Sequence, residues 1–245
     1  MFFFEFVIIS TLIFFQSIFG LGLLIFGTPI FFLMGYNFLD ILNMLVPISI
    51  TISAIHFFST NINIKKFIHN FNFFCLPLLI TSLYFMINYY EKINLELLIS
   101  IFIILFSILS LKKKKIKYLK NFTLLKQKIF LSIIGVVHGL SNLGGFLLAT
   151  LSSTINVEDK NKTRICIAYG YLIMGIVQIL AINFFSYSNV KAVHIPYIAL
   201  VFLIYFPAQK IFNKFKSESF AKFVNIIALF FGVIILVKSV FKLYI

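Results

Sequence analysis

Long apolar runs, separated by short polar or basic loops, constrain this chain more than any other feature. Of the 245 residues, 61% are hydrophobic and only 11% are charged, and the mean hydropathy is +1.07. The interior of a soluble domain of this size could not bury so much apolar surface. Since a helix needs about 20 apolar residues to cross a bilayer, we predict an all-α polytopic membrane protein with about eight transmembrane helices. They are residues 2–36, 38–58, 71–90, 95–111, 129–155, 165–185, 192–209 and 221–240.

The formal net charge is +14, and the basic residues that produce it are concentrated in the loops. The lysines lie mostly between the apolar runs, where they set topology and meet anionic headgroups, so we expect the lipid bilayer and not nucleic acid as the partner. Cys75 and Cys166 lie inside apolar segments without CxxC spacing, which favours buried thiols and no metal site. We predict no cofactor. The N-terminus lacks a basic region and a cleavage site, so the first run is expected to stay as a span.

The fifth run contains polar and flexible residues that a lipid-facing helix does not need. His138, Ser141 and Asn142 lie between the pairs Gly135/Gly139 and Gly144/Gly145. In hydrocarbon, an irregular backbone persists only against protein or a water-filled cavity. Broken helices of this kind place half-helix N-termini, with free N–H groups, at the centre of transporters. Residues 135–153 are therefore predicted to form one wall of a site for a small anion.

The first run has similar interruptions. It is too long for one straight crossing and contains Gly20, Gly22, Gly27 and Pro29. We therefore expect helices 1 and 5 to be broken at their Gly-rich motifs. The helix at 38–58 should be kinked near Pro47, which lacks an N–H group.

The glycines also predict an internal repeat. Eight of the 11 lie in two stretches about half a chain apart, and each stretch opens a group of four spans. The predicted units are residues 1–111 and 129–245, joined by a linker at 112–128 that contains eight lysines. Because four is an even number, the two halves should be parallel.

Neutral hydrogen-bond donors and glycines near mid-membrane are the candidate substrate ligands. Neutral donors would bind an anion without preventing its release. Alternatively, these glycines and polar side chains serve only helix packing and interhelical hydrogen bonds. For Gly170 and Gly175 we favour packing alone. The predicted substrate-binding residues are Gly20, Gly22, Thr28, Asn43, Ser141, Asn142, Gly144 and Gly145.

Three ionisable residues are further candidates. All seven acidic residues fall at predicted span ends or in loops, so His138 or His56 would carry a coupled proton, unless these histidines are simply hydrogen-bonded and neutral. Arg164 begins the sixth span and could attract or gate an anion. Alternatively, it is a topological charge that reaches toward the headgroups.

Two motifs resemble one family. The sequence Gly20-Leu-Gly22-Leu-Leu-Ile-Phe-Gly27-Thr28-Pro29 is similar to the first-span motif of the TauE/SafE sulfite-exporter-like permeases, and Gly135-x-x-His-Gly139-x-x-x-x-Gly144-Gly145 is similar to the start of their second repeat. The chain departs from the family at Leu23-Leu24, where many members have a glycine run, and at 147–150, where a proline is usual. The resemblance implies a multi-pass permease of the bacterial inner membrane. Its substrate would be sulfite, a sulfonate, or another sulfur-containing or organic anion, moved by alternating access.

Other functions remain open from sequence. A non-transporting membrane scaffold or assembly factor is one alternative, and a homo-oligomer is possible. A DsbD-like thiol electron carrier is another, although Cys75 and Cys166 do not occupy equivalent places in the two halves. The chain has no Walker motif, no HExxH and no recognisable Ser/His/Asp spacing, so we predict no catalytic residues and no enzyme activity.

Overall fold

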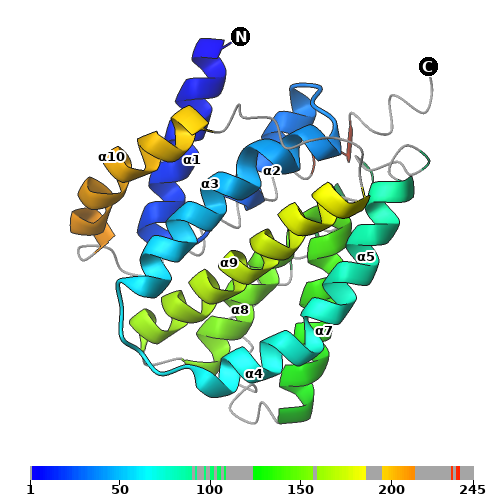
Figure 1. Cartoon of the computed structure of the whole chain (residues 1–245), viewed down its shortest axis with the longest axis vertical. Helices are drawn as coiled ribbons and strands as arrows, with labels where there is room; N and C mark the ends of the chain where they lie inside the picture. The colour runs from blue at the N-terminus through cyan, green and yellow to red at the C-terminus, as the bar shows by residue number, and fades with distance from the viewer. Residues whose placement is uncertain are drawn as a thin grey trace.

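The computed structural model describes residues 2–89, 124–156, 159–185 and 195–212, together with positions 92, 97, 100, 101, 104, 105, 108, 233, 236 and 237. This part of the chain is helical and contains no strand (Figure 1). The helices are α1 (Phe2–Phe19), α2 (Leu23–Leu33), α3 (Phe38–Phe58), α4 (Lys65–Phe74), α5 (Leu76–Tyr89), α7 (Leu124–Ser141), α8 (Gly144–Ile155), α9 (Lys160–Phe185) and α10 (Ile195–Phe212).

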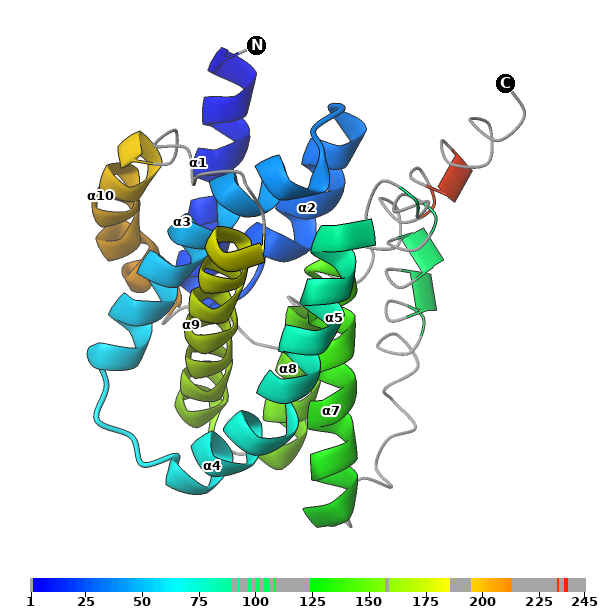
Figure 2. The ribbon, with the colours of Figure 1, turned by 45° about the vertical axis from the view of Figure 1, so that its right-hand side comes forward.

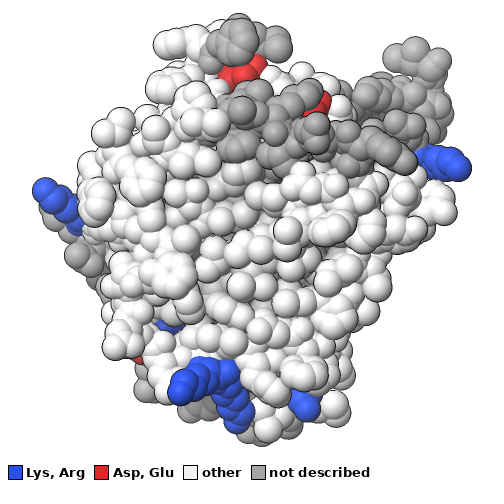
Figure 3. All heavy atoms as spheres, in the orientation of Figure 1, with Lys and Arg blue, Asp and Glu red and all other residues white. Residues whose placement is uncertain are grey.

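Five helical segments of the described part are long and apolar enough to cross a membrane, as expected for a helical, multi-pass membrane protein. Between the charged side chains near its edges, the face shown in Figure 3 presents a broad uncharged surface. Large apolar side chains such as Phe202 and Leu203 are exposed on such surfaces, as expected where lipid replaces water. The five segments are Phe38–Phe58, Lys65–Tyr89, Leu124–Ser141, Asn161–Phe185 and Ile195–Phe212.

Several predicted spans can be compared with these helices. α3 has the predicted bounds and continues through Pro47, and the Asn37 side chain caps it by accepting from the Asp40 N–H at 2.8 Å. The predicted span at 71–90 instead begins at Lys65, because α4 and α5 follow each other with only Cys75 between them. The spans predicted at 95–111 and 221–240, and the lysine-rich linker, lie largely outside the described residues.

The first run breaks where predicted, and the chain then reverses. Gly20 and Gly22 have φ angles of 73° and 134°, which glycine adopts without steric cost, so α1 stops and α2 begins three residues later. α2 then packs back along α1, as its contacts show. The Phe15 and Phe26 rings lie 6.4 Å apart, and Tyr36 donates a hydrogen bond to Glu5. We call α1 and α2 hairpin one.

The fifth run also breaks and reverses. α7 ends at Ser141, Asn142 has a φ angle of 62°, and α8 begins at Gly144. Asparagine is one of the few residues with a side chain that tolerate this left-handed conformation. The break falls within the predicted Gly-rich motif, with Asn142 at the turn and the glycine pair at the start of the next helix. The start of α7 and the end of α8 lie beside one pocket, so α7 and α8 form hairpin two.

The two hairpins enter the molecule from opposite ends. In Figure 2, α1 descends from the N-terminus, whereas α7 rises from the other end, which also holds the start of α4. We call these the N-terminal end and the basic end. A hairpin returns the chain to the side it came from, so α3 and α9 begin at opposite ends and run in opposite directions. Among the described helices, α3 and α9 are therefore antiparallel, whereas the prediction of parallel halves had counted each broken run as a full crossing.

Glycines let the helices approach closely. A Cβ at Gly135 would overlap the carbonyl oxygen of Cys75, and one at Gly139 would overlap the Ser82 hydroxyl, so this pair seats α7 on α5. On α9, Gly170 faces Leu148 and Gly175 faces Ile50, which is the packing role expected for both.

Candidate functional site

The turn of hairpin two meets helix α2 of hairpin one inside the molecule. The Asn142 side-chain amide donates to the Thr28 hydroxyl at 3.1 Å, and neither residue is exposed. Thr28 belongs to α2 and Asn142 forms the turn of hairpin two. The contact links residues 114 positions apart in the chain. The sequence predicted both as site residues, and the structure brings them together.

Two further side chains extend this contact into a buried row. Gln178 of α9 donates from Nε2 to Asn142 Oδ1 at 3.1 Å, and its Oε1 lies 3.2 Å from His138 Nε2. Because Gln178 Oε1 can only accept, His138 Nε2 carries the proton. The Nδ1 atom of His138 is then an acceptor, and it is buried without a hydrogen-bond partner. We call Thr28, Asn142, Gln178 and His138 the hairpin relay.

A second unpartnered group lies near the end of this relay. The Tyr171 hydroxyl is buried and makes no hydrogen bond, and its ring centroid lies 6.3 Å from that of His138. Gly144 and Gly145 make room here, since a Cβ on Gly144 would lie 2.5 Å from His138 Cβ and one on Gly145 would overlap Tyr171. These glycines therefore provide clearance for the His138 and Tyr171 side chains.

The tip of each hairpin contains the N-terminus of its second helix. The N-cap residues Gly22 and Leu143 provide no side-chain cap for α2 or α8. The first N–H groups of each helix have no acceptor within the helix, and they carry the positive end of its dipole. Ser141, predicted as a ligand, is satisfied locally: its hydroxyl donates to Val137 O at 2.7 Å and accepts from the Leu143 N–H at 3.3 Å.

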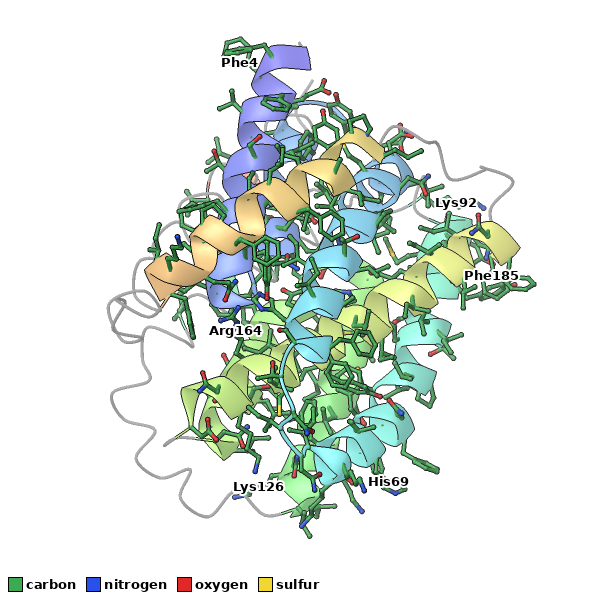
Figure 4. All side chains as sticks on the ribbon, turned by 60° about the vertical axis from the view of Figure 1, so that its left-hand side comes forward. Phe4, His69, Lys92, Lys126, Arg164 and Phe185 are labelled. Atoms are coloured by element: carbon green, nitrogen blue, oxygen red, sulfur yellow. The ribbon has the colours of Figure 1, made fainter. Side chains whose placement is uncertain are left out.

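Arg164 lies at the tip of hairpin one. A Cβ on Gly20 would meet Arg164 Cγ at 3.4 Å. Figure 4 shows Arg164 deep within the height of the molecule, whereas Lys126 and His69 lie at the basic end. Its Nη2 donates to His56 Nδ1, to Gln209 Oε1 and, at 3.4 Å, to Ser17 O.

Every hydrogen-bond partner that Arg164 makes among the described residues is neutral. The Ser17 carbonyl belongs to the last turn of α1, where the helix dipole is negative, but this supplies only a partial charge. The Nε atom of Arg164 is buried and has no partner. A buried cation without a counter-charge is costly. Among the described residues, the partly buried guanidinium thus has neutral hydrogen-bond partners and a cation–π contact with the Phe212 ring at 4.3 Å, but no anionic partner.

His56 is a fixed member of this arginine cluster, which we define as Arg164, His56, Tyr205, Gln209 and Ser17. Besides Arg164, the Tyr205 hydroxyl lies 2.9 Å from His56 Nδ1, and the Gln209 amide donates to Ser17 O at 2.7 Å. The lone pair on His56 Nδ1 therefore already accepts a hydrogen bond, whereas His138 Nδ1 has no hydrogen-bond partner. Of the two predicted proton carriers, the geometry favours His138.

Sequence reasoning missed part of this site. Ser17, Tyr205, Gln209 and Gln178 were not chosen as ligands, although each is a polar residue within an apolar run. Asn43 was chosen, and it is buried on α3 with its Oδ1 unpartnered, but none of the hydrogen bonds described here joins it to the relay. Within the described residues, no three His, Cys, Asp or Glu side chains are grouped to hold a metal ion.

Compared with known proteins, the chain matches no family model, no curated protein and no solved structure. Its function must therefore be inferred from the residues of the site themselves.

Proposed function

We propose that this protein is a permease for a small anion such as sulfite, a sulfonate or a related sulfur-containing or organic anion. One observation carries the proposal: the partly buried Arg164 guanidinium has only neutral hydrogen-bond partners among the described residues and lies beside the break of hairpin one. An oxyanion that reached Arg164 would supply the missing charge and could form the paired hydrogen bonds that guanidinium groups favour.

The surrounding residues suit reversible binding. The uncapped N-terminus of α2 adds N–H donors next to Gly20 and Gly22. A single cation that already shares its charge with His56, Gln209 and Ser17 would hold an anion less tightly than a cluster of cations would. A transported ligand must also be released, so moderate affinity serves the function.

The inverted hairpins provide a route to alternating access. We propose that the two halves of the chain are inverted repeats, and that the Asn142–Thr28 contact opens and closes as one hairpin moves against the other. If a proton is coupled to transport, His138 Nδ1 would accept it. The basic end, with Lys65 and Lys66, would face the cytoplasm of a bacterium and the protein would lie in its inner membrane.

Anion-dependent thermal stability of the purified protein tests this proposal, because a ligand that binds only the folded state raises apparent stability. Sulfite and an alkane sulfonate should raise the midpoint of unfolding of the wild type, and chloride at equal ionic strength should raise it less. Arg164→Gln should lose this response, and Lys210→Gln, an equal change of charge on exposed α10 surface, should keep it.

Equal stabilisation of wild type and Arg164→Gln would contradict an anion site at Arg164, and no stabilisation of either would favour a scaffold. A thiol electron carrier is less supported, because both Cys75 and Cys166 are buried and unpaired.

A further inference from the structure

A pocket at the basic end lies apart from the hairpin tips. Its volume is about 390 Å³, which is within the usual range for a small organic ligand. It lies between the start of α4, the first turn of α7, the end of α8 and the first turns of α9. Its polar lining consists of Lys65, Lys66, Lys162, Asn63, Gln127 and Asn156.

The charge of this pocket is positive. Three lysines line it, and no carboxylate is among the residues that line it in the described part of the chain. The nearby Asp159 carboxylate accepts from the Lys162 backbone N–H at 2.8 Å, so it caps the first turn of α9. The Asn63 and Gln127 amides can donate to an anion as well, whereas the Asn156 amide already donates to Ser152 O at 3.0 Å and to Cys166 Sγ at 3.6 Å.

Backbone donors add to the lysines. Ile64, the N-cap residue of the ten-residue helix α4, offers no side-chain hydrogen bond. Asn63 Oδ1 accepts from the Lys65 N–H at 3.1 Å, whereas the N–H groups of Lys66 and Phe67 have no acceptor within the helix. The pocket thus combines fixed N–H donors with flexible cations, which is the donor set that phosphate prefers.

Apolar surface continues from the pocket along α7. Leu124 lines the pocket and is 52% exposed, Leu125 is 67% exposed, and Ile129, about one turn further on, is 54% exposed. The floor of the pocket is also apolar, with Ile64, Phe67 and Ile155. A free inorganic anion would gain nothing from this surface, whereas acyl chains could lie along it.

We propose that this pocket binds the phosphate headgroup of an anionic phospholipid, with its acyl chains along α7. Basic pockets between transmembrane helices at the cytoplasmic side recognise such headgroups through Lys and Arg. The lipid would bridge α4, α7 and α9, and so hold the open end of hairpin two. This site uses none of the hairpin relay or arginine cluster, so it does not depend on the proposed transport function.

The test measures retention of phosphatidylglycerol by the purified full chain in native mass spectrometry, with phosphatidylcholine as the neutral lipid. The variant is the triple Lys65→Gln, Lys66→Gln and Lys162→Gln. The matched control, Lys92→Gln, Lys126→Gln and Lys210→Gln, removes the same charge from lysines that do not line the pocket.

We expect the wild type and the control to prefer phosphatidylglycerol, and the pocket variant to bind it at least tenfold more weakly, since each surface lysine contributes about fivefold. Size-exclusion elution and the unfolding midpoint check that each variant is folded. Equal losses in both triple variants would show diffuse attraction and overturn the proposal. In a second arm, inorganic phosphate is added to the wild type at the same concentration as the lipid. If it stabilises the wild type against heat as much as the lipid does, the pocket binds free anions and the lipid assignment is wrong.

Discussion

At the scale of single residues, Arg164 distinguishes this chain from a helix bundle that only fills the membrane. Its Nη2 atom has three side-chain or backbone partners, all neutral, and its position beside Gly20 could not be read from the sequence. Sequence pattern placed Arg164 at the start of a span, where most arginines reach toward headgroups. The tilt of α9 and the reversal at Gly20 instead bring the end of α1 to it, and these are tertiary effects.

Arg164→Lys should separate charge from geometry. Lysine keeps the positive charge but cannot donate to His56, Gln209 and a substrate oxygen from one planar group. We expect sulfite affinity to fall by about tenfold, with partial retention of the thermal response, measured by titrating sulfite against the unfolding midpoint. Unchanged affinity would show that only the charge matters.

Gly145 tests the packing beside the relay. A methyl group there would overlap the Tyr171 hydroxyl and ring, and Tyr171 is fully buried and cannot easily move aside. Gly145→Ala should therefore destabilise the protein by about 1–3 kcal/mol, as overpacked cores do. Gly35→Ala is the comparison, because its Cβ meets nothing within 4 Å and only its φ angle of 90° opposes the change. If Gly145→Ala melts at the wild-type temperature, the packing described here is wrong.

At the scale of elements, the glycine clusters predicted where two helices stop but not that the chain then reverses. Gly20 and Gly22 permit positive φ angles, and any of several directions is compatible with that freedom. The direction is set by contacts distant in sequence, such as Tyr36 with Glu5. Burial and this carboxylate raise the pKa of the Tyr36 phenol to about 12, so it remains a donor at neutral pH.

Asn142 links the two hairpins, so its side chain should control the proposed movement of one hairpin against the other. Removing its side chain breaks the bonds to Thr28 and Gln178 and leaves the Gln178 amide donor unpaired in a buried place. Asn142→Ala should slow anion flux by roughly tenfold or more, because loss of a buried hydrogen bond costs about 1–3 kcal/mol. Alanine also disfavours the φ angle of 62° at this turn. Asn142→Gly restores the turn without the side chain, so normal flux in the glycine variant would assign the effect to backbone strain alone.

At the scale of the whole molecule, composition was sufficient for the membrane class, but the inversion was not predictable. The prediction of parallel halves followed from counting an even number of spans in each half. Hydropathy alone cannot distinguish a run of 35 apolar residues that turns back from one that crosses the membrane. The structure places the N-terminus and the turn after α2 at the same end.

Labelling with a membrane-impermeant maleimide tests this topology. In a background of Cys75→Ala and Cys166→Ala, single cysteines at the exposed positions Phe4 and Met34 should react from one side of the membrane. Cysteines at Lys126 and Asp159, which are both exposed, should react from the other side. A crossing between residues 4 and 34 would place those two on opposite sides and contradict hairpin one.

The proposed passage of an anion across the membrane past Arg164 can be measured as flux. The direct measurement is the uptake of labelled sulfite into proteoliposomes that contain the wild type, Arg164→Gln or no protein, at matched protein density. The account predicts saturable uptake by the wild type, competition by an alkane sulfonate, and uptake by Arg164→Gln reduced at least tenfold, since a charge-assisted hydrogen bond contributes about 1.5–3 kcal/mol. Uptake by the wild type no faster than by protein-free vesicles for sulfite and sulfonates alike, or equal uptake by Arg164→Gln, would contradict it.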